Sequence, residues 1–102
     1  GSLLTPDGTR LVDTPGFPEE YKTEALAFAE VLELFRAAGD AVAWTLVSPA
    51  PAYPVDKSSG AYVSGADSPA GPALSTADFA LALVDEAERD AHRGARFTVA
   101  SA

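Results

Sequence analysis

Cysteine and methionine are absent from this 102-residue chain, and tryptophan and histidine occur only once each. Without cysteine the chain can form no disulfide framework and no reactive thiolate. A single histidine leaves no Cys/His set for a zinc site. No apolar run reaches the roughly 18 residues of a membrane span, and the first residues lack the basic start and apolar core of a signal peptide. We therefore predict no metal, no membrane partner and a cytoplasmic location.

Basic residues are also scarce, with 7 Lys+Arg against 15 Asp+Glu and a net charge of −8. Nucleic acids and anionic membranes are bound by basic patches, so we predict neither as a partner. The remaining composition, 47% hydrophobic and 22% charged, is ordinary for a globular protein. A small-molecule ligand stays open, because the amides at a helix N-terminus can hold an anion even in an acidic domain.

A first helix is predicted from Pro18 to about Ala38. Proline and acidic residues suit the first turn of a helix, and Gly39 is a typical C-terminal stop. Apolar residues recur at helical spacing and predict the buried face: Phe28, Val31, Leu32 and Phe35.

A buried strand is predicted over residues 43–48, because this run is continuously apolar and includes Trp44, which we assign to the core. Helix, short link and buried strand favour an α/β fold with a βαβ arrangement. Prolines 49, 51 and 54 are expected to stop the strand ladder. The long segment 49–74 is the least regular part, with one strand-like piece at 61–63.

A second helix is predicted from Ser75. Ser75 and Asp78 resemble a capping box, in which each side chain bonds the other's backbone amide, so we interpret Asp78 as a cap rather than a ligand. The predicted apolar face consists of Phe79, Ala80, Leu83, Val84 and Ala87. A closing strand follows at 96–100. His92 falls at the polar end of this helix, where a cationic side chain favours the helix dipole.

The order of these segments resembles the C-terminal half of an atypical short-chain dehydrogenase/reductase. The residues that carry this resemblance are Leu11–Pro18, Trp44–Ala50, the Ser75 helix and Phe97–Ala100. Within that superfamily they are most like NADH-flavin reductase-like and NAD(P)-dependent epimerase/dehydratase-like proteins. Gly1-Ser2-Leu3 resembles the end of that family's Gly-Gly-Ala-Gly-Ser-Leu segment, although Gly1-Ser2 as a cloning remnant remains an alternative.

The resemblance implies the C-terminal part of a Rossmann-type, doubly wound parallel sheet with flanking helices. Residues 1–102 would be a single partial domain, the C-terminal half of a NAD(P)-binding fold whose N-terminal dinucleotide-binding half is absent. In agreement, the chain contains no G-x-G-x-x-G fingerprint.

The resemblance also implies a site. In the family that this chain resembles, the strand–proline segment passes close to the nicotinamide ring. The resemblance therefore makes Ser48, Pro49 and Ala50 the candidate cofactor-binding residues. Their place fits the rule that ligands lie outside the carboxyl ends of the strands, but Pro49 as a plain strand terminator is the alternative. Tyr53 and Tyr62 are candidate substrate-binding residues, because with Lys57 and Asp67 they lie in or beside a loop that suits a substrate lid. A merely solvated loop is equally compatible.

The implied activity is part of an NAD(P)H-dependent oxidoreductase that reduces flavin, as a substrate, or a quinone-like or small carbonyl acceptor. The family's catalytic tyrosine precedes a lysine by four positions, whereas Tyr21 is followed at that distance by Ala25. The missing pair fits flavin reduction better than carbonyl reduction. The alternative is a non-catalytic NAD(P)-sensing or protein-interaction module on a degenerate Rossmann scaffold. The fragment alone is expected to be inactive and to form a homo-oligomer through exposed sheet edges.

Overall fold

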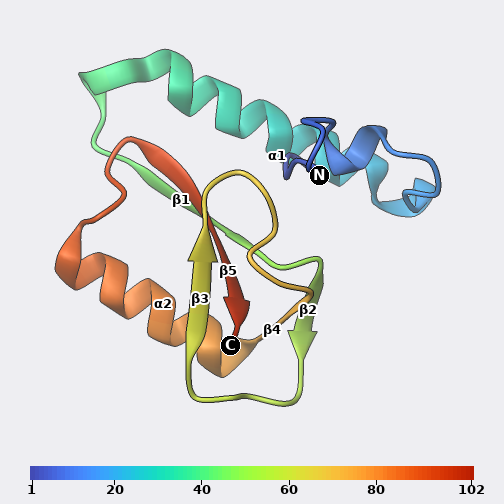
Figure 1. The fold of residues 1–102 in the computed structure, drawn as a ribbon. Coiled ribbons are helices and arrows are strands. Elements are labelled where there is room, and N and C mark those ends of the chain that lie inside the picture. Colours follow the sequence, from blue (N-terminus) through green and yellow to red (C-terminus); the bar gives the residue numbers. More distant parts are fainter.

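Two helices lie on opposite sides of a small group of strands in the computed structural model, which describes all of residues 1–102 (Figure 1). The helices are α1 (Glu19–Ala38) and α2 (Thr76–Arg89). Short 3-10 helices at Leu11–Asp13 and Gly39–Ala41 precede and follow α1. The strands are β1 (Thr45–Pro49), β2 (Ala52–Val55), β3 (Tyr62–Gly65), β4 (Ala73–Ser75) and β5 (Ala95–Ser101).

The main sheet has the strand order β1-β5-β3. β1 and β5 are parallel, with Val47 opposite Phe97, and a second, two-stranded sheet pairs β2 with β4 in parallel. The α/β class with parallel strands is thus confirmed, but a wholly parallel sheet is not, because β3 runs antiparallel to β5. The chain reverses between β2 and β3 (Figure 1), where Gly60 adopts a φ of 77° that favours glycine.

The predicted bounds of α1 are confirmed, since it begins after Pro18 and ends before Gly39, whose φ is 56°. The predicted buried face is wrong in part. The buried residues are Ala25, Ala29 and Leu32, whereas Phe28 is 63% exposed. The N-terminal segment runs so close to this face that a Cβ on Gly1 would lie 2.5 Å from that of Ala25, which leaves room only for small side chains there.

The predicted apolar face of α2 is wrong in large part. Phe79 packs against the core as predicted, but the buried residues of the helix are Asp78 and Ala82. Leu83 and Val84 are 44% and 57% exposed, and Ala80 and Ala87 are exposed as well. The small side chain of Ala82 lets the helix approach the strands closely, as one of a buried apolar cluster: Ala50, Leu74, Ala82, Phe97, Val99 and Ala100. Neither helix has the length and apolarity needed to cross a membrane.

The β1 ladder ends at Pro49 as predicted, and Pro51 lies between strands, but Pro54 stands inside a strand, which corrects the prediction for that proline. Pro49 is the last residue of β1, and Pro54 lies in β2. Each of these strands has a partner on one side only, so a missing N–H can face away from the ladder. Trp44 precedes β1 but is a core residue as predicted, buried with its ring centroid 5.6 Å from that of Phe35.

Candidate functional site

A buried arginine on β5 connects three other segments of the chain. The Arg96 side chain is only 2% exposed. Its Nε and Nη2 donate to Asp67 Oδ1 at 3.2 and 2.9 Å, and Nη1 donates to Ser2 Oγ at 2.9 Å and Ser48 Oγ at 3.3 Å. Nη2 also donates to the Ser2 carbonyl at 3.3 Å. These bonds match the five N–H donors of a guanidinium, so Arg96 holds protein segments together and has no donor left for an external anion.

Asp67 anchors this arginine from the connection between β3 and β4. Its Oδ1 also accepts a 3.1 Å hydrogen bond from Arg36 on α1, and its carbonyl accepts one of 2.9 Å from the Leu4 amide. Burial opposes ionisation of Asp67, but the hydrogen bond and charge of Arg96, with those of Arg36, outweigh it and hold the pKa of this carboxyl below its usual value. Asp67 therefore stays ionised and joins the N-terminal segment, α1 and β5.

The predicted cofactor segment ends β1 beside this cluster. Ser48 Oγ accepts the bond from Arg96 and donates none within the chain. Pro49 lies opposite Val99 in the last pair of the ladder, and Ala50 is buried in the apolar cluster. Ser48 is thus the one side chain of the three with an uncommitted polar hydrogen, at the carboxyl edge of the parallel pair.

Tyr53 and Tyr62, the predicted substrate residues, contact α2 and do not contact the cluster around Arg96. The Tyr62 hydroxyl donates a 2.7 Å hydrogen bond to Asp85, and this bond, with burial, raises the pKa of Tyr62. The exposed Tyr53 ring packs edge-on against Phe79, 5.3 Å between centroids. Side chains alternate between the faces of a strand, so Ser48 points away from the face on which Val47 packs with the α2 cluster. The structure places Tyr62 and Ser48 on opposite faces of the sheet.

Asp78 binds a loop that the sequence did not connect with it. Ser75 caps α2 as predicted, accepting a 3.0 Å bond from the Asp78 amide. The Asp78 carboxylate does not return to Ser75, however, and accepts from the hydroxyls of Ser58 and Ser101 and from the amides of Ser59 and Gly60. The hydrogen bonds from Ser101 and Ser58 hold the pKa of Asp78 well below its usual range. This carboxylate is a fixed structural anion and no proton acceptor.

The remaining titratable candidates are engaged within the chain. His92 lies beyond the end of α2, with Nδ1 2.6 Å from Glu86 Oε1 and its ring stacked on Phe97 at 4.0 Å. Lys22 pairs with Glu19 at 3.2 Å on an exposed turn of α1. No three His, Asp or Glu side chains converge as a metal ion would require.

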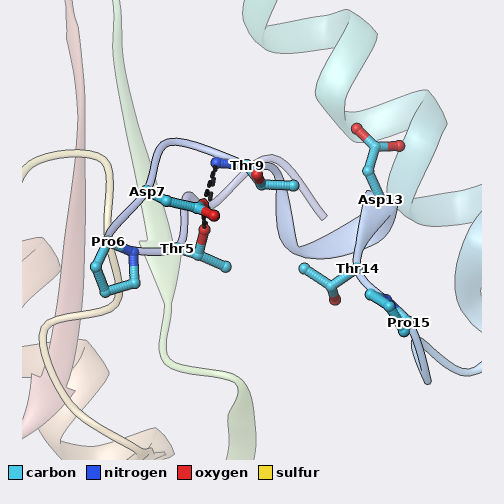
Figure 2. A pocket seen from close by; sticks show the side chains of 7 residues that line it. All are labelled: Thr5, Pro6, Asp7, Thr9, Asp13, Thr14 and Pro15. Atoms are coloured by element: carbon cyan, nitrogen blue, oxygen red, sulfur yellow. Dashed lines mark hydrogen bonds between the residues drawn. The ribbon is translucent and has the colours of Figure 1, made fainter.

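A hollow of about 390 Å³ lies on the surface of the N-terminal segment (Figure 2). Its lining is Thr5, Pro6, Asp7, Thr9, Asp13, Thr14 and Pro15. Asp7 accepts from the Thr5 hydroxyl and, at 3.0 Å, from the Thr9 amide, as Figure 2 shows. Asp13 pairs with Arg10 at 2.8 Å. The carboxylates of Asp7 and Asp13 therefore stabilise the N-terminal segment itself. The Ser48–Arg96 region remains the better candidate site.

Comparison with known proteins yields no matching family profile. The chain is 39% identical to the uncharacterized protein YwnB of Bacillus subtilis (strain 168) over 99% of this chain and 51% of YwnB. A crystal structure from Streptococcus pneumoniae TIGR4, described as "a putative NADH-flavin reductase", superposes with a TM-score of 0.90 and 35% identity over 100% of this chain and 52% of that one. A "putative epimerase" from Bacteroides thetaiotaomicron gives 0.86 and 30% identity over 99% and 49%. The chain spans about half the length of these proteins.

Proposed function

We propose, from the premise that this chain fits as a C-terminal fragment of the atypical short-chain dehydrogenase/reductase family, that it forms part of an NAD(P)H-dependent oxidoreductase. One observation carries the proposal. Ser48 stands at the carboxyl edge of the parallel β1–β5 pair, with its oxygen held by Arg96 and its hydroxyl hydrogen uncommitted. Ligands of open α/β sheets bind outside this edge.

We also propose that residues 1–102 form one partial domain of a doubly wound Rossmann fold. Two features support it. β1 has a neighbour only on the β5 side, although parallel strands are normally interior. The apolar residues Leu83 and Val84 remain exposed on α2. Each feature is expected of a surface that a dinucleotide-binding half covers.

The residues at this edge fit a nicotinamide cofactor. The Ser48 hydroxyl can donate a hydrogen bond, Pro49 stiffens the chain where it leaves the strand, and buried Ala50 anchors the following turn. When bound, NAD(P)H supplies the hydride, while the protein binds and orients it. Ser48, Pro49 and Ala50 are accordingly proposed as cofactor contacts. Tyr53 and Tyr62 both contact α2, so each would contact a substrate only from the α2 side.

Flavin is the proposed acceptor, with a quinone-like or small carbonyl compound as the other choices. Flavin reduction needs little proton transfer from the protein, and the structure offers few groups for it. Tyr21 is largely exposed, and Lys22 pairs with Glu19 rather than with a tyrosine. The similarity to the Streptococcus pneumoniae protein described as "a putative NADH-flavin reductase" supports the same choice.

A second function, cofactor sensing without catalysis, is favoured by one observation. The titratable side chain of the Ser48 cluster is Asp67, whose pKa is held below its usual value by Arg96 and Arg36. Asp67 therefore stays ionised and has no proton to donate to a substrate. A NAD(P)-sensing or protein-interaction module would need none.

The test is binding and turnover by the full-length protein that carries these residues. NADH and NADPH binding is followed by cofactor fluorescence, and oxidation is assayed with flavin, quinone and carbonyl acceptors. We expect binding, oxidation with flavin, and a roughly two- to tenfold weaker affinity in Ser48→Ala, the value of one hydrogen bond. Ser64→Ala, on an exposed position of β3, is the matched control. Binding without oxidation of any acceptor would favour the sensing module, and no binding would overturn both functions.

A further inference from the structure

We propose that Arg96 is a positioning residue that fixes the Ser48–Pro49–Ala50 segment against the N-terminal segment at Ser2. The inference rests on the proposed function, because it assigns to Arg96 the placement of the cofactor contacts. Arg96 does not touch the cofactor in this account. It acts through the hydroxyl of Ser48, to which its Nη1 donates.

The hydrogen bonds of Arg96 fix the geometry of the cluster. Nη1 donates to both Ser2 Oγ and Ser48 Oγ, although the arginine and Ser2 are 94 residues apart in the chain. The guanidinium is planar, so two bonds from Nε and Nη2 to a single oxygen of Asp67 fix its rotation about the side-chain axis. Its remaining N–H groups then point in set directions, and the two serine oxygens are held at one separation.

The bond from Arg96 leaves the Ser48 hydroxyl able to donate a hydrogen bond. A hydroxyl has one hydrogen to donate and two lone pairs that accept. The bond from Arg96 occupies a lone pair of Ser48, and the hydrogen has no acceptor in the chain. Hydrogen bonds in a chain strengthen one another, so a cationic donor to the oxygen makes this O–H a better donor. Arg96 thus both places Ser48 and prepares it to bind an acceptor on a ligand.

A buried ion pair adds little net stability, because desolvation of the charges offsets their attraction, and an apolar replacement is often as stable. Net stability is therefore a weak reason for a small domain to bury an arginine that is only 2% exposed. A requirement for one defined geometry at the end of β1 accounts for it better.

The experiment uses the full-length protein with four variants: Arg96→Lys, Ser48→Ala, the double variant, and Arg93→Lys as control. Lysine keeps the charge of Arg96 but lacks the planar fork. Arg93 is 67% exposed and pairs only with Asp90, so its replacement by lysine matches the chemistry without the cluster. NAD(P)H affinity and the kcat and KM for the acceptor are measured for each.

Because Arg96 acts through Ser48, we expect Arg96→Lys to weaken NAD(P)H affinity and kcat/KM by roughly two- to tenfold, no more than Ser48→Ala does. The KM for the acceptor should change little, so that the loss in kcat/KM lies in kcat. The double variant should bind no more weakly than the weaker single variant. The inference would be overturned if the losses of NAD(P)H affinity in Arg96→Lys and Ser48→Ala multiplied in the double variant. It would also be overturned if Arg96→Lys had the same affinity as Arg93→Lys.

A second measurement separates this inference from the proposed function. Backbone amide exchange at Ser48 and Ala50 is compared between Arg96→Lys and Arg93→Lys without any ligand. Faster exchange at these two amides in Arg96→Lys alone is expected even if the protein binds no cofactor. Unchanged exchange there would refute the positioning role. If Arg96→Lys does not fold, Asp67→Asn provides the same comparison, because it removes the anchor of the guanidinium and retains the arginine.

Discussion

The carboxylate of Asp78, in the first turn of α2, accepts a 2.6 Å hydrogen bond from the hydroxyl of Ser101 at the end of β5. It also accepts from the Ser58 hydroxyl at 2.6 Å and from the amides of Ser59 and Gly60, each at 3.0 Å. A buried carboxylate is unfavourable unless such donors satisfy it. One side chain therefore joins a loop, a helix and the last strand, and it can occupy an inward position of α2.

Asp78→Asn should destabilise the fold at neutral pH, because an amide cannot accept all these bonds and places two N–H donors against other donors. The depressed pKa makes the effect depend on pH. The contribution of Asp78 is complete above the unfolded-state pKa of 3.8 and is lost as the pH falls below it toward the lower folded-state value. Urea unfolding at pH 7 and pH 3 should therefore show a gap between wild type and variant that narrows in acid.

Asp40→Asn is the control for this experiment, since Asp40 is exposed in the 3-10 helix after α1. Its replacement should leave the free energy of unfolding within about 0.5 kcal/mol of wild type. An Asp78→Asn variant as stable as Asp40→Asn at pH 7 would show that the buried hydrogen bonds contribute nothing net.

Tyr62→Phe should lower the free energy of unfolding by about 0.5–1.5 kcal/mol, because it removes the bond from the phenol to Asp85. The raised pKa of Tyr62 has the opposite sign from that of Asp78. Its contribution is complete below the unfolded-state pKa of 10.0 and is lost as the pH rises above it. Urea unfolding at pH 7 and absorbance titration at alkaline pH measure both effects. Tyr53 makes no hydrogen bond through its hydroxyl within the chain, so Tyr53→Phe should match wild type in urea unfolding and should keep the part of the absorbance titration that is due to Tyr62.

Gly65→Ala should cost about 1–3 kcal/mol through overpacking. A Cβ on Gly65 would lie 2.8 Å from Thr98 Oγ1 and 3.3 Å from the Ser68 carbonyl. Thr98 is fully buried and donates to that carbonyl, so neither atom can yield without breaking their 2.8 Å bond. Thermal unfolding should show a lower midpoint for Gly65→Ala and no change for Ser64→Ala, the exposed neighbour in β3. Equal midpoints would mean that the strand can shift to make room.

The elements that sequence predicted best depend on adjacent residues. Pro18 and Gly39 bound α1, and the Ser75 cap begins α2, because capping involves groups within a few positions of each other. The segment at Ser48 follows in a similar way, from an apolar run that ends at a proline. Helix caps and strand-ending prolines can therefore be predicted from the sequence without knowledge of the rest of the fold.

What sequence could not predict depends on distant partners. Asp78 turns inward because Ser58 and Ser101, 20 and 23 residues away, supply its donors, and this rotation exposes Leu83. Arg96 at the start of a strand is unremarkable until Ser2 and Asp67 are seen around it. The buried face of α1 likewise depends on the N-terminal segment that covers it. The spacing of apolar residues shows that a helix has a buried face. It does not show which residues form that face when the segment that covers them is distant in the sequence.

Self-association is expected of the 102-residue chain in isolation. β1 offers an unpaired edge, and α2 presents Leu83 and Val84 to solvent. Free strand edges and exposed apolar residues both favour contact with a second copy. Light scattering coupled to size-exclusion chromatography should give a mass above that of the 10.5 kDa monomer, rising with protein concentration.

Leu83→Glu tests which of these surfaces is used. Burial of one leucine contributes roughly 1.5–3 kcal/mol, so its loss should raise the dissociation constant about 10- to 100-fold if α2 lies in the contact. Leu34→Glu is the matched control, because Leu34 is an exposed leucine on α1, on the other side of the sheet. Association weakened by Leu83→Glu alone assigns the contact to α2, and association unchanged by either variant favours a free strand edge such as that of β1. A wild-type chain that stays monomeric at all concentrations would contradict the expected self-association. It would show that the free edge of β1 and the exposed apolar residues of α2 are both stable in contact with water.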